Sequence, residues 1–161
     1  MTDWVQQLGL VPHPEGGFYK ETYRAELQLP VPWDTKRTRS AGTGIYYLLK
    51  ANDFSCWHRI RSDEGWHFYA GQTLEIHVLD SDGYRVLRLG IEAEAYPQHW
   101  VPARSWFAAR LADPHPDHFA LVGCTVAPGF DFADFEMANA SLLDQFPEHS
   151  ADIRPLLKKR A

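Results

Sequence analysis

From Thr43 onward the chain is divided into short segments rich in β-branched and aromatic residues, and this regular division constrains its fold more than any other feature. Turn-forming residues such as Asp80-Ser81-Asp82-Gly83 separate the segments. Many short strands at such spacing predict an antiparallel sandwich or barrel, and so an all-β fold. In chain order the segments are TGIYYLLK, FSCWHRIR, EGWHFYAG, TLEIHVLD, YRVLRLG, QHWVPA, SWFAARL and HFALVGCTVAP.

The two ends of the chain differ from this strand-rich region. Thr2 is placed to cap a short helix that ends at Gly9. After the last strand segment, Ser141 and Ser150 begin stretches typical of short capped helices. A chain of 161 residues fits one hydrophobic core, so we expect a single domain over residues 1–161 with short N- and C-terminal helices.

Composition excludes several classes of partner. The net charge of −5 comes without a basic stripe, so we expect no nucleic acid. No apolar run approaches the ~18 residues of a membrane span, and the first residues lack the basic start of a secretion signal. Two cysteines, Cys56 and Cys124, are too few for a disulfide framework, and reduced thiols fit a cytoplasmic location.

His58 and Glu64 form the most informative polar pair in the sequence. If residues 61–63 make a tight turn, the alternation of strand side chains brings the imidazole and the carboxyl face to face across a hairpin. His67 then points to the opposite face. Two interpretations stay open, a site whose imidazole moves protons near neutral pH and a bonded pair that only stabilises the turn. The apolar residues on the same faces are Ile60, Trp66 and Phe68.

Several stretches resemble known families. His58, Glu64 and Gly71 resemble the first motif of the cupin superfamily, G-x5-H-x-H-x(3,4)-E-x6-G, and residues 98–107 resemble the second, with Arg104 in place of its glycine. The chain as a whole resembles cupin_5, a family of small RmlC-like cupins of unknown function. That resemblance implies a double-stranded β-helix, or jelly roll, that forms a homodimer. The matching stretches are PHPEGGFYKETYR, GIYYLL, WHRIRSDEGWHFYAG, VPARSWFAA and LVGCTVAPGFDFADFE.

The resemblance also bears on metal binding. Cupin metal sites are formed by three histidines and a glutamate, of which His58 and Glu64 are present, while Ile60 and Phe107 occupy the positions of the other two histidines. A divalent transition metal needs at least three protein donors, so we expect no cofactor. If a divalent metal does bind, the ligands to expect are His58, Glu64 and His67.

Three functions follow as alternatives. Within the superfamily, His58 resembles the histidine base of dTDP-4-dehydrorhamnose 3,5-epimerase, which implies metal-free epimerase or isomerase chemistry on a sugar or nucleotide sugar, with Glu64 orienting the base and a tyrosine as acid. An aromatic share of 14% with six Trp equally suits a protein that binds a sugar or nucleotide without chemistry. The third alternative is a metal-dependent enzyme. The candidate tyrosines are Tyr19, Tyr46, Tyr47 and Tyr69, of which Tyr47 is taken as the acid.

For the first two functions we expect a small-molecule pocket with contacts from strands and flanking segments. Glu15 or Glu21, on either side of Gly16-Gly17, could complete the site, although a rigid turn leading into an edge strand is the simpler interpretation. The acidic and aromatic segment 129–136, GFDFADFE, is expected to fasten the C-terminal segment to the sheet. The expected ligand contacts are Trp66, Phe68, Phe107, Gln98, Tyr19, Glu21 and Arg59.

Overall fold

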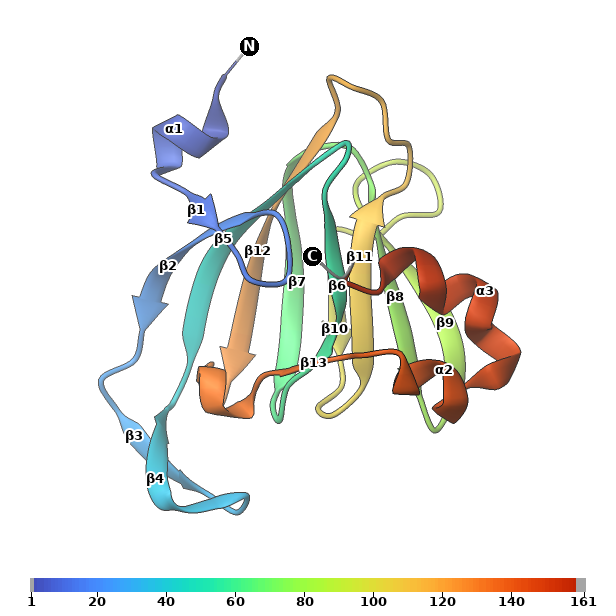
Figure 1. Cartoon of the computed structure of the whole chain (residues 1–161). Helices are drawn as coiled ribbons and strands as arrows, with labels where there is room; N and C mark the ends of the chain where they lie inside the picture. The colour runs from blue at the N-terminus through green and yellow to red at the C-terminus, as the bar shows by residue number, and fades with distance from the viewer. Residues whose placement is uncertain (1, 159–161) are drawn as a thin grey trace.

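The computed structural model describes residues 2–158 and consists of two β-sheets packed face to face, with a short hairpin beside them (Figure 1). The first sheet contains, in spatial order, β1 (Val11–Pro12), β2 (Phe18–Arg24), β5 (Thr43–Lys50), β12 (Phe119–Ala127), β7 (Asp63–Gly71) and β10 (Gln98–Val101). The second contains β13 (Glu136–Met137), β6 (Phe54–Arg59), β11 (Trp106–Leu111), β8 (Leu74–Asp80) and β9 (Gly83–Leu89). The hairpin consists of β3 (Gln28–Val31) and β4 (Asp34–Ser40).

Consecutive strands in the middle of the chain alternate between the two sheets. β5 and β7 belong to the first sheet, whereas β6 and β8 belong to the second, and every pairing within the sheets is antiparallel. Each turn therefore carries the chain across the space between the sheets, which is the winding of a double-stranded β-helix. The predicted all-β jelly roll is confirmed.

The same winding overturns one local prediction. The pairing of His58 with Glu64 depended on a tight turn at residues 61–63 that would join β6 and β7 in a hairpin. No such hairpin forms, because β6 pairs with β11 and β13, whereas β7 pairs with β12 and β10. The parity of side chains along each strand was correct. Parity does not specify which sheet a strand joins, because that depends on pairing with distant segments.

The core lies between the sheets, where the inward side chains of both interdigitate. Leu74, Ile76 and Val78 of β8 are fully buried, as are Trp66 of β7 and Phe107 of β11. These residues follow the period of two that places every second side chain on the inner face.

The chain ends form the short helices that the sequence predicts. Helix α1 (Trp4–Leu8) is capped by Asp3, whose carboxylate accepts a hydrogen bond from the amide of Gln6, rather than by Thr2. No helix within residues 2–158 is long and apolar enough to cross a membrane. At the other end lie α2 (Ser141–Gln145), η2 (Pro147–His149), α3 (Ser150–Ile153) and η3 (Arg154–Leu156), without side-chain caps from Ser141 or Ser150.

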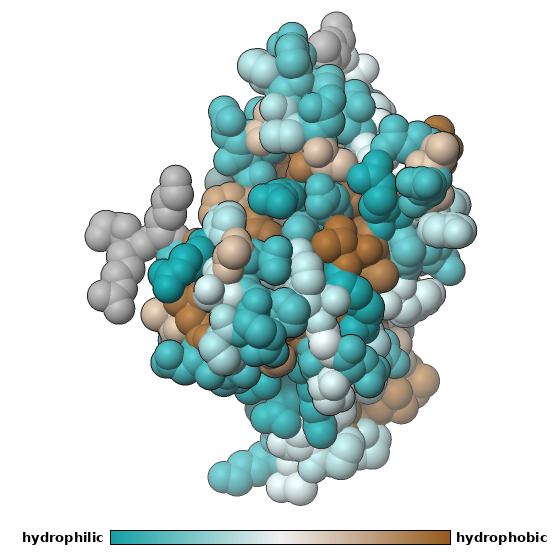
Figure 2. All heavy atoms as spheres, turned by 90° about the vertical axis from the view of Figure 1, so that its right-hand side faces the viewer, coloured by the Kyte–Doolittle hydropathy of each residue, from teal (hydrophilic) through white to brown (hydrophobic). Residues whose placement is uncertain are grey.

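The C-terminal helices cover the outer face of the second sheet. Trp57 of β6 is fully buried beneath them, and its indole N–H donates a hydrogen bond to the carbonyl oxygen of Ile153 at 3.0 Å. Seen from the side of these helices, the surface is largely hydrophilic, with hydrophobic atoms in small separate groups (Figure 2). The helices thus bury an apolar sheet face and present polar side chains to solvent.

We expect Trp57→Ala to lower the free energy of unfolding by about 3–5 kcal/mol, because it removes a large buried ring and leaves a carbonyl without its donor. Urea unfolding measures this loss. Trp100→Ala is the matched control, since Trp100 is 53% exposed and its loss should change stability by about 1 kcal/mol or less. Equal losses in the two variants would contradict this view of how the helices are held.

Candidate functional site

A cavity of about 520 Å³ opens between the sheets at the end of the barrel nearest β1, β2 and the segment before β13. Its lining comes from both sheets and from the loop before β2, so no single stretch of sequence forms it. The residues that line it are Gly9, Val11, His13, Glu15, Tyr19, Lys20, Glu21, Arg24, Thr43, Ile45, His58, Ile60, Glu64, Cys124, Val126, Phe130, Asp131, Phe132 and Phe135.

His58 is held from both ring nitrogens. Nδ1 lies 2.6 Å from the carbonyl oxygen of Cys56, and a carbonyl can only accept, so Nδ1 carries a proton. Nε2 lies 2.7 Å from Oε2 of Glu15, and both side chains are almost completely buried. With Nδ1 protonated, the charge of the pair depends on whether Nε2 or the Glu15 carboxyl carries the next proton, and the pKa shifts of the two groups indicate which form is favoured.

The pKa values of this pair move in the directions that keep both groups charged. Burial alone would raise the pKa of Glu15, but the charge and hydrogen bonding of His58, with smaller effects of His13 and Ser55, leave it lowered. Burial alone would lower the pKa of His58, but Glu15 outweighs it, with Glu64 and the Cys56 carbonyl adding to the rise. Both shifts therefore favour the imidazolium–carboxylate form of the pair.

Glu64 of β7 is the second carboxyl of the cavity and behaves oppositely. Burial raises its pKa to about 7, the negative charge of Glu15 adds to the rise, and His58 only partly opposes it. It makes no ion pair with His58 among the contacts of the described residues. The expected partnership between His58 and Glu64 is thus wrong: Glu15 orients the imidazole, and Glu64 faces it from the other sheet with its proton available near neutral pH.

The PHPEGG loop brings Glu15 to His58 and is fixed by backbone hydrogen bonds. The carbonyl of Glu15 accepts from the amide of Cys56 at 2.8 Å, which joins the loop to β6. The amide of Glu15 donates to Nδ1 of His13 at 3.0 Å, and the hydroxyl of Tyr47 donates to the carbonyl of Gly16 at 2.5 Å. The loop is therefore both the rigid turn and the source of a site residue, the two interpretations that the sequence left open.

Three phenylalanines form an aromatic wall of the cavity. The rings of Phe130 and Phe132 are 4.8 Å apart, and Phe135 stacks against His58 with centroids 5.3 Å apart. The segment that carries them includes η1 (Phe132–Asp134). We expected GFDFADFE to fasten the C-terminal segment to the sheet; three of its rings line the cavity.

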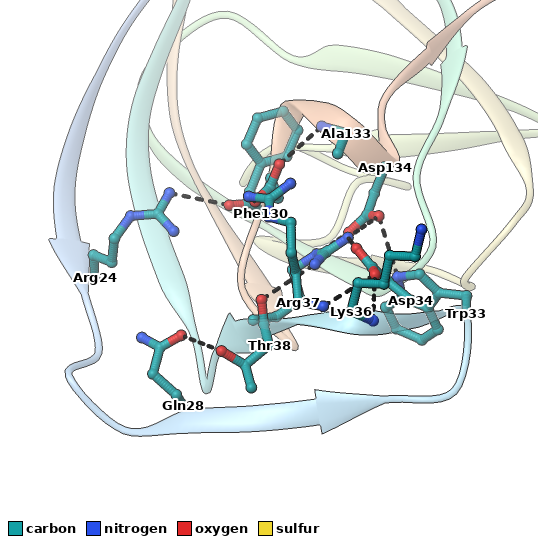
Figure 3. A network of polar contacts seen from close by, with 12 residues as sticks. Arg24, Gln28, Trp33, Asp34, Lys36, Arg37, Thr38, Phe130, Ala133 and Asp134 are labelled. Carbon is teal, nitrogen blue, oxygen red and sulfur yellow. Dashed lines mark hydrogen bonds and ion pairs between the residues drawn. The ribbon is translucent and has the colours of Figure 1, made fainter.

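The β3–β4 hairpin holds this aromatic wall in place through ion pairs (Figure 3). The buried guanidinium of Arg39 binds both carboxylate oxygens of Asp134 at 2.7 Å and also pairs with Asp34 at 3.1 Å. Arg37 pairs with Asp131 at 2.8 Å. Because the bidentate pair joins two segments that are distant in sequence, it fixes the direction in which the phenylalanines point.

Two of the predicted ligand contacts line the cavity. Tyr19 and Glu21 lie on the inner face of β2. Glu21 pairs with Arg24 at 2.7 Å, so its charge is neutralised at the rim. Tyr19 packs edge-on against His13, with ring centroids 4.6 Å apart.

The other predicted contacts lie elsewhere. Tyr47, Trp66 and Phe107 are buried in the core and Phe68 packs against it, so none of the four is among the residues that line the cavity. Tyr47 was expected to act as an acid, but its hydroxyl is committed to the carbonyl of Gly16, and burial raises its pKa far above the usual value. Large rings at inward positions can either fill the barrel or line a cavity. Strand parity shows that a ring points inward but does not distinguish these two cases.

Two polar candidates sit outside the cavity altogether. Gln98 on β10 contacts Nδ1 of His67 at 3.3 Å on the outer face of the first sheet. Arg59 pairs with Glu136 at 2.7 Å and lies over the Trp106 ring at 4.3 Å. Neither lines the cavity.

The donor set does not fit a cupin metal site. Ile60 and Phe107 stand where two histidines would be needed, and His67 faces outward, bound to Thr125, as parity predicts. Within residues 2–158 no three His, Cys, Asp or Glu side chains lie close enough together to hold a metal ion. His58 and Glu64 alone give two donors, one of which is already bound to Glu15.

Sequence reasoning missed several residues of the site. His13, Cys124, Phe130, Phe132 and Phe135 all line the cavity. Cys124 carried a usable signal, because it alternates with Val122 and Val126 on one strand face, and all three are buried. The phenylalanines lie in irregular structure, where no periodicity indicates direction.

We expect the stability of the protein to fall between pH 4.5 and about 7 because of Glu64. In that range the folded protein keeps a proton that the unfolded chain releases, so the free energy of unfolding falls as pH rises, by about 3 kcal/mol for this group. In Glu64→Gln this part of the fall should vanish in urea unfolding measured across the range. The exposed Glu92→Gln is the control; a Glu64→Gln profile parallel to the wild type would contradict the raised pKa.

We expect Gly16→Ala to lower the free energy of unfolding by about 2 kcal/mol or more and to lower the pKa of His58. Gly16 has φ of +111°, and a Cβ there would overlap the carbonyl oxygen of Phe54, so the loop that carries Glu15 has to move. NMR titration of the His58 imidazole measures its pKa. Gly83→Ala is a matched control, with φ of +103° and open space around it; an unchanged His58 pKa in Gly16→Ala would refute the role of the loop.

Comparison with known proteins places the chain among relatives of the same fold. A hypothetical protein from Leishmania major is 34% identical, with a TM-score of 0.87 and 97% of each chain covered. Protein SO0799 from Shewanella oneidensis is 36% identical, with a TM-score of 0.85 over 98% of this chain and 97% of its own. The uncharacterized protein YML079W of Saccharomyces cerevisiae is 27% identical over 83% of this chain and 71% of its own.

The family model described as "Cupin superfamily (DUF985)", Cupin_5, matches residues 2–138. That match contains both motifs, the PHPEGG loop and the aromatic wall. The chain therefore belongs to the Cupin_5 family of the cupin superfamily.

Proposed function

We propose that the protein binds a small polar metabolite in the barrel cavity and transfers protons on it without a metal, as a sugar epimerase or isomerase does. The observation that carries the proposal is the pair of carboxyls with opposite pKa shifts, Glu15 lowered and Glu64 raised to about 7, in one cavity. Groups whose surroundings separate their pKa values in this way are suited to divide acid and base roles.

The positions of these groups match what epimerisation requires. The base removes the proton next to a carbonyl, the electron pair moves to the carbonyl oxygen, and a second group returns a proton to the opposite side of the carbon. His58 with Glu15 belongs to the wall formed by the second sheet, and Glu64 to the wall formed by the first. Two proton-carrying groups thus approach a bound molecule from two sheets.

The roles follow from the contacts of each group. Since Nε2 of His58 faces Glu15 at 2.7 Å, the imidazole exchanges a proton with a ligand once its ring turns toward the cavity, and in that way the pair is one proton carrier. Glu64 is the other proton carrier, because a carboxyl with a pKa of about 7 is present in both its protonated and its ionised form near neutral pH. Tyr19, rather than Tyr47, is the tyrosine that lines the cavity and can contact the ligand.

The rest of the lining supports an uncharged, sugar-like ligand. Phenylalanine rings offer apolar faces on which a sugar ring stacks, and Ile45 and Ile60 add apolar surface to the lining. Arg24 is neutralised by Glu21, which leaves Lys20 as a lining cation without an ion pair among the described residues. One such cation is a weak match for the two negative charges of a nucleotide sugar, so we favour a free sugar or a related hydroxy-ketone.

Binding without chemistry is the second candidate. Both ring nitrogens of His58 are engaged inside the protein, by Cys56 and Glu15, which would suit a purely structural ion pair beneath a binding pocket. The two candidates differ in one measurable property, the exchange of a ligand proton with solvent.

We expect the wild-type protein to exchange the proton α to the carbonyl of a keto-sugar with deuterium from D₂O, and Glu64→Gln to do so at least about 100-fold more slowly. NMR of a panel of keto-sugars, free and nucleotide-linked, measures both. The exchange rate should change through about pH 7, where Glu64 titrates. Glu92→Gln, an exposed carboxyl paired with Arg88, should behave as the wild type.

The same panel decides between the candidates. A sugar that shifts protein signals of Tyr19 or Phe132 but exchanges no proton would overturn the enzymatic proposal and support the binding protein. Exchange that survives in Glu64→Gln would remove Glu64 from the mechanism while leaving catalysis in place.

A further inference from the structure

A second, smaller hollow of about 160 Å³ lies beside the cavity and gathers three arginines. Arg59 ends β6, Arg61 follows it in the turn to β7, and Arg104 lies in the turn between β10 and β11. Ile60 lines both the hollow and the cavity. Two carboxylates complete the lining, those of Asp134 and Glu136.

The charges around the hollow do not balance. Asp134 is bound at 2.7 Å by Arg39, which lies outside the hollow, and Glu136 is bound at 2.7 Å by Arg59. Neither Arg61 nor Arg104 forms an ion pair with any acid in the part of the chain that the structure describes. Two exposed guanidinium groups at the hollow therefore have no carboxylate partner among the described residues and are free to bind an anion.

The backbone of Arg104 supplies an independent observation. Its φ is 69°, in the left-handed region, where a side chain costs conformational energy and glycine does not. The second cupin motif has a glycine at the matching position. The amide of Arg104 donates to the carbonyl of Ile60 at 2.9 Å, so the turn itself needs no side chain there. Arg104 thus presents its guanidinium to the hollow from a backbone conformation that favours glycine.

We propose that Arg59, Arg61 and Arg104 form a binding site for a phosphate group. The planar guanidinium presents several N–H donors in a fork that matches phosphate oxygens. Arg59 is already held over the Trp106 ring at 4.3 Å, which limits its freedom before binding. Since a water takes about 30 Å³ of liquid volume, the hollow of about 160 Å³ has room for a tetrahedral oxyanion and bound water.

The site is separate from the proton-transfer groups and does not depend on the proposed function. The phosphate group has two sources, the free ion or a phosphorylated metabolite whose remainder extends into solvent from the hollow. Both use the same arginines, and titration with inorganic phosphate and with methyl phosphate separates them.

The test compares thermal unfolding in sodium phosphate with that in sodium chloride of equal ionic strength. At about 100 times the dissociation constant we expect the Tm of the wild type to rise by about 5–10 °C. In Arg104→Gly the rise should be lost while the fold is kept, because glycine accepts the backbone conformation without strain. Arg61→Gln should reduce the rise as well.

Glu94→Gly is the matched control, since Glu94 has φ of 65° but does not line the hollow. It should relieve comparable strain and keep the full response to phosphate. A rise with methyl phosphate as large as that with phosphate shows that the site accepts a phosphate ester and supports a phosphorylated metabolite, and a rise with inorganic phosphate alone supports the free ion. No rise in the wild type, or an equal rise in Arg104→Gly, would overturn the proposal.

Discussion

The ion pair between Glu15 and His58 is the interaction on which the cavity depends. Removing two charges from water is costly, and a buried pair gains stability only where its geometry and remaining hydrogen bonds are good. Here Nδ1 of His58 is satisfied by the Cys56 carbonyl, but Oε2 of Glu15 has the imidazolium at 2.7 Å without a well-aligned hydrogen bond. An apolar pair would have served the fold at least as well, so the charges are better explained by function than by stability.

This one pair also determines the state of the second carboxyl. A cavity that already holds the Glu15 carboxylate resists a second negative charge, and the single imidazolium is closer to Glu15 than to Glu64. Glu64 therefore stays protonated up to about pH 7. The jelly-roll winding makes this possible, because it places β6 and β7 in different sheets and separates their side chains across the lumen. A hairpin would have joined the two residues into one neutralised pair.

Features of the structure that depend on residues close together in sequence can be predicted from the sequence, whereas features that depend on contacts between distant segments cannot. The alternation of side chains along a strand is a local property, and it correctly predicted that His58 and Glu64 point inward and that His67 points outward. Which sheet a strand joins, and that Glu15 rather than Glu64 reaches the imidazole, depend on contacts between segments far apart in sequence. The same holds for the aromatic wall, whose direction is fixed by the arginines of the β3–β4 hairpin. The motif resemblance supplied the fold because it reflects the whole chain.

The incomplete hydrogen bonding of Glu15 suggests how a ligand and the base are coupled. Oε2 is shielded from solvent and faces the imidazole, so a hydroxyl group of a bound molecule donates to this acceptor only after the His58 ring has moved aside. That bond would stabilise the carboxylate without the imidazolium and so weaken the hold of Glu15 on the proton carried by His58. The group best able to release His58 for chemistry would then be the ligand itself, and molecules without a hydroxyl at that point would bind without activating the base.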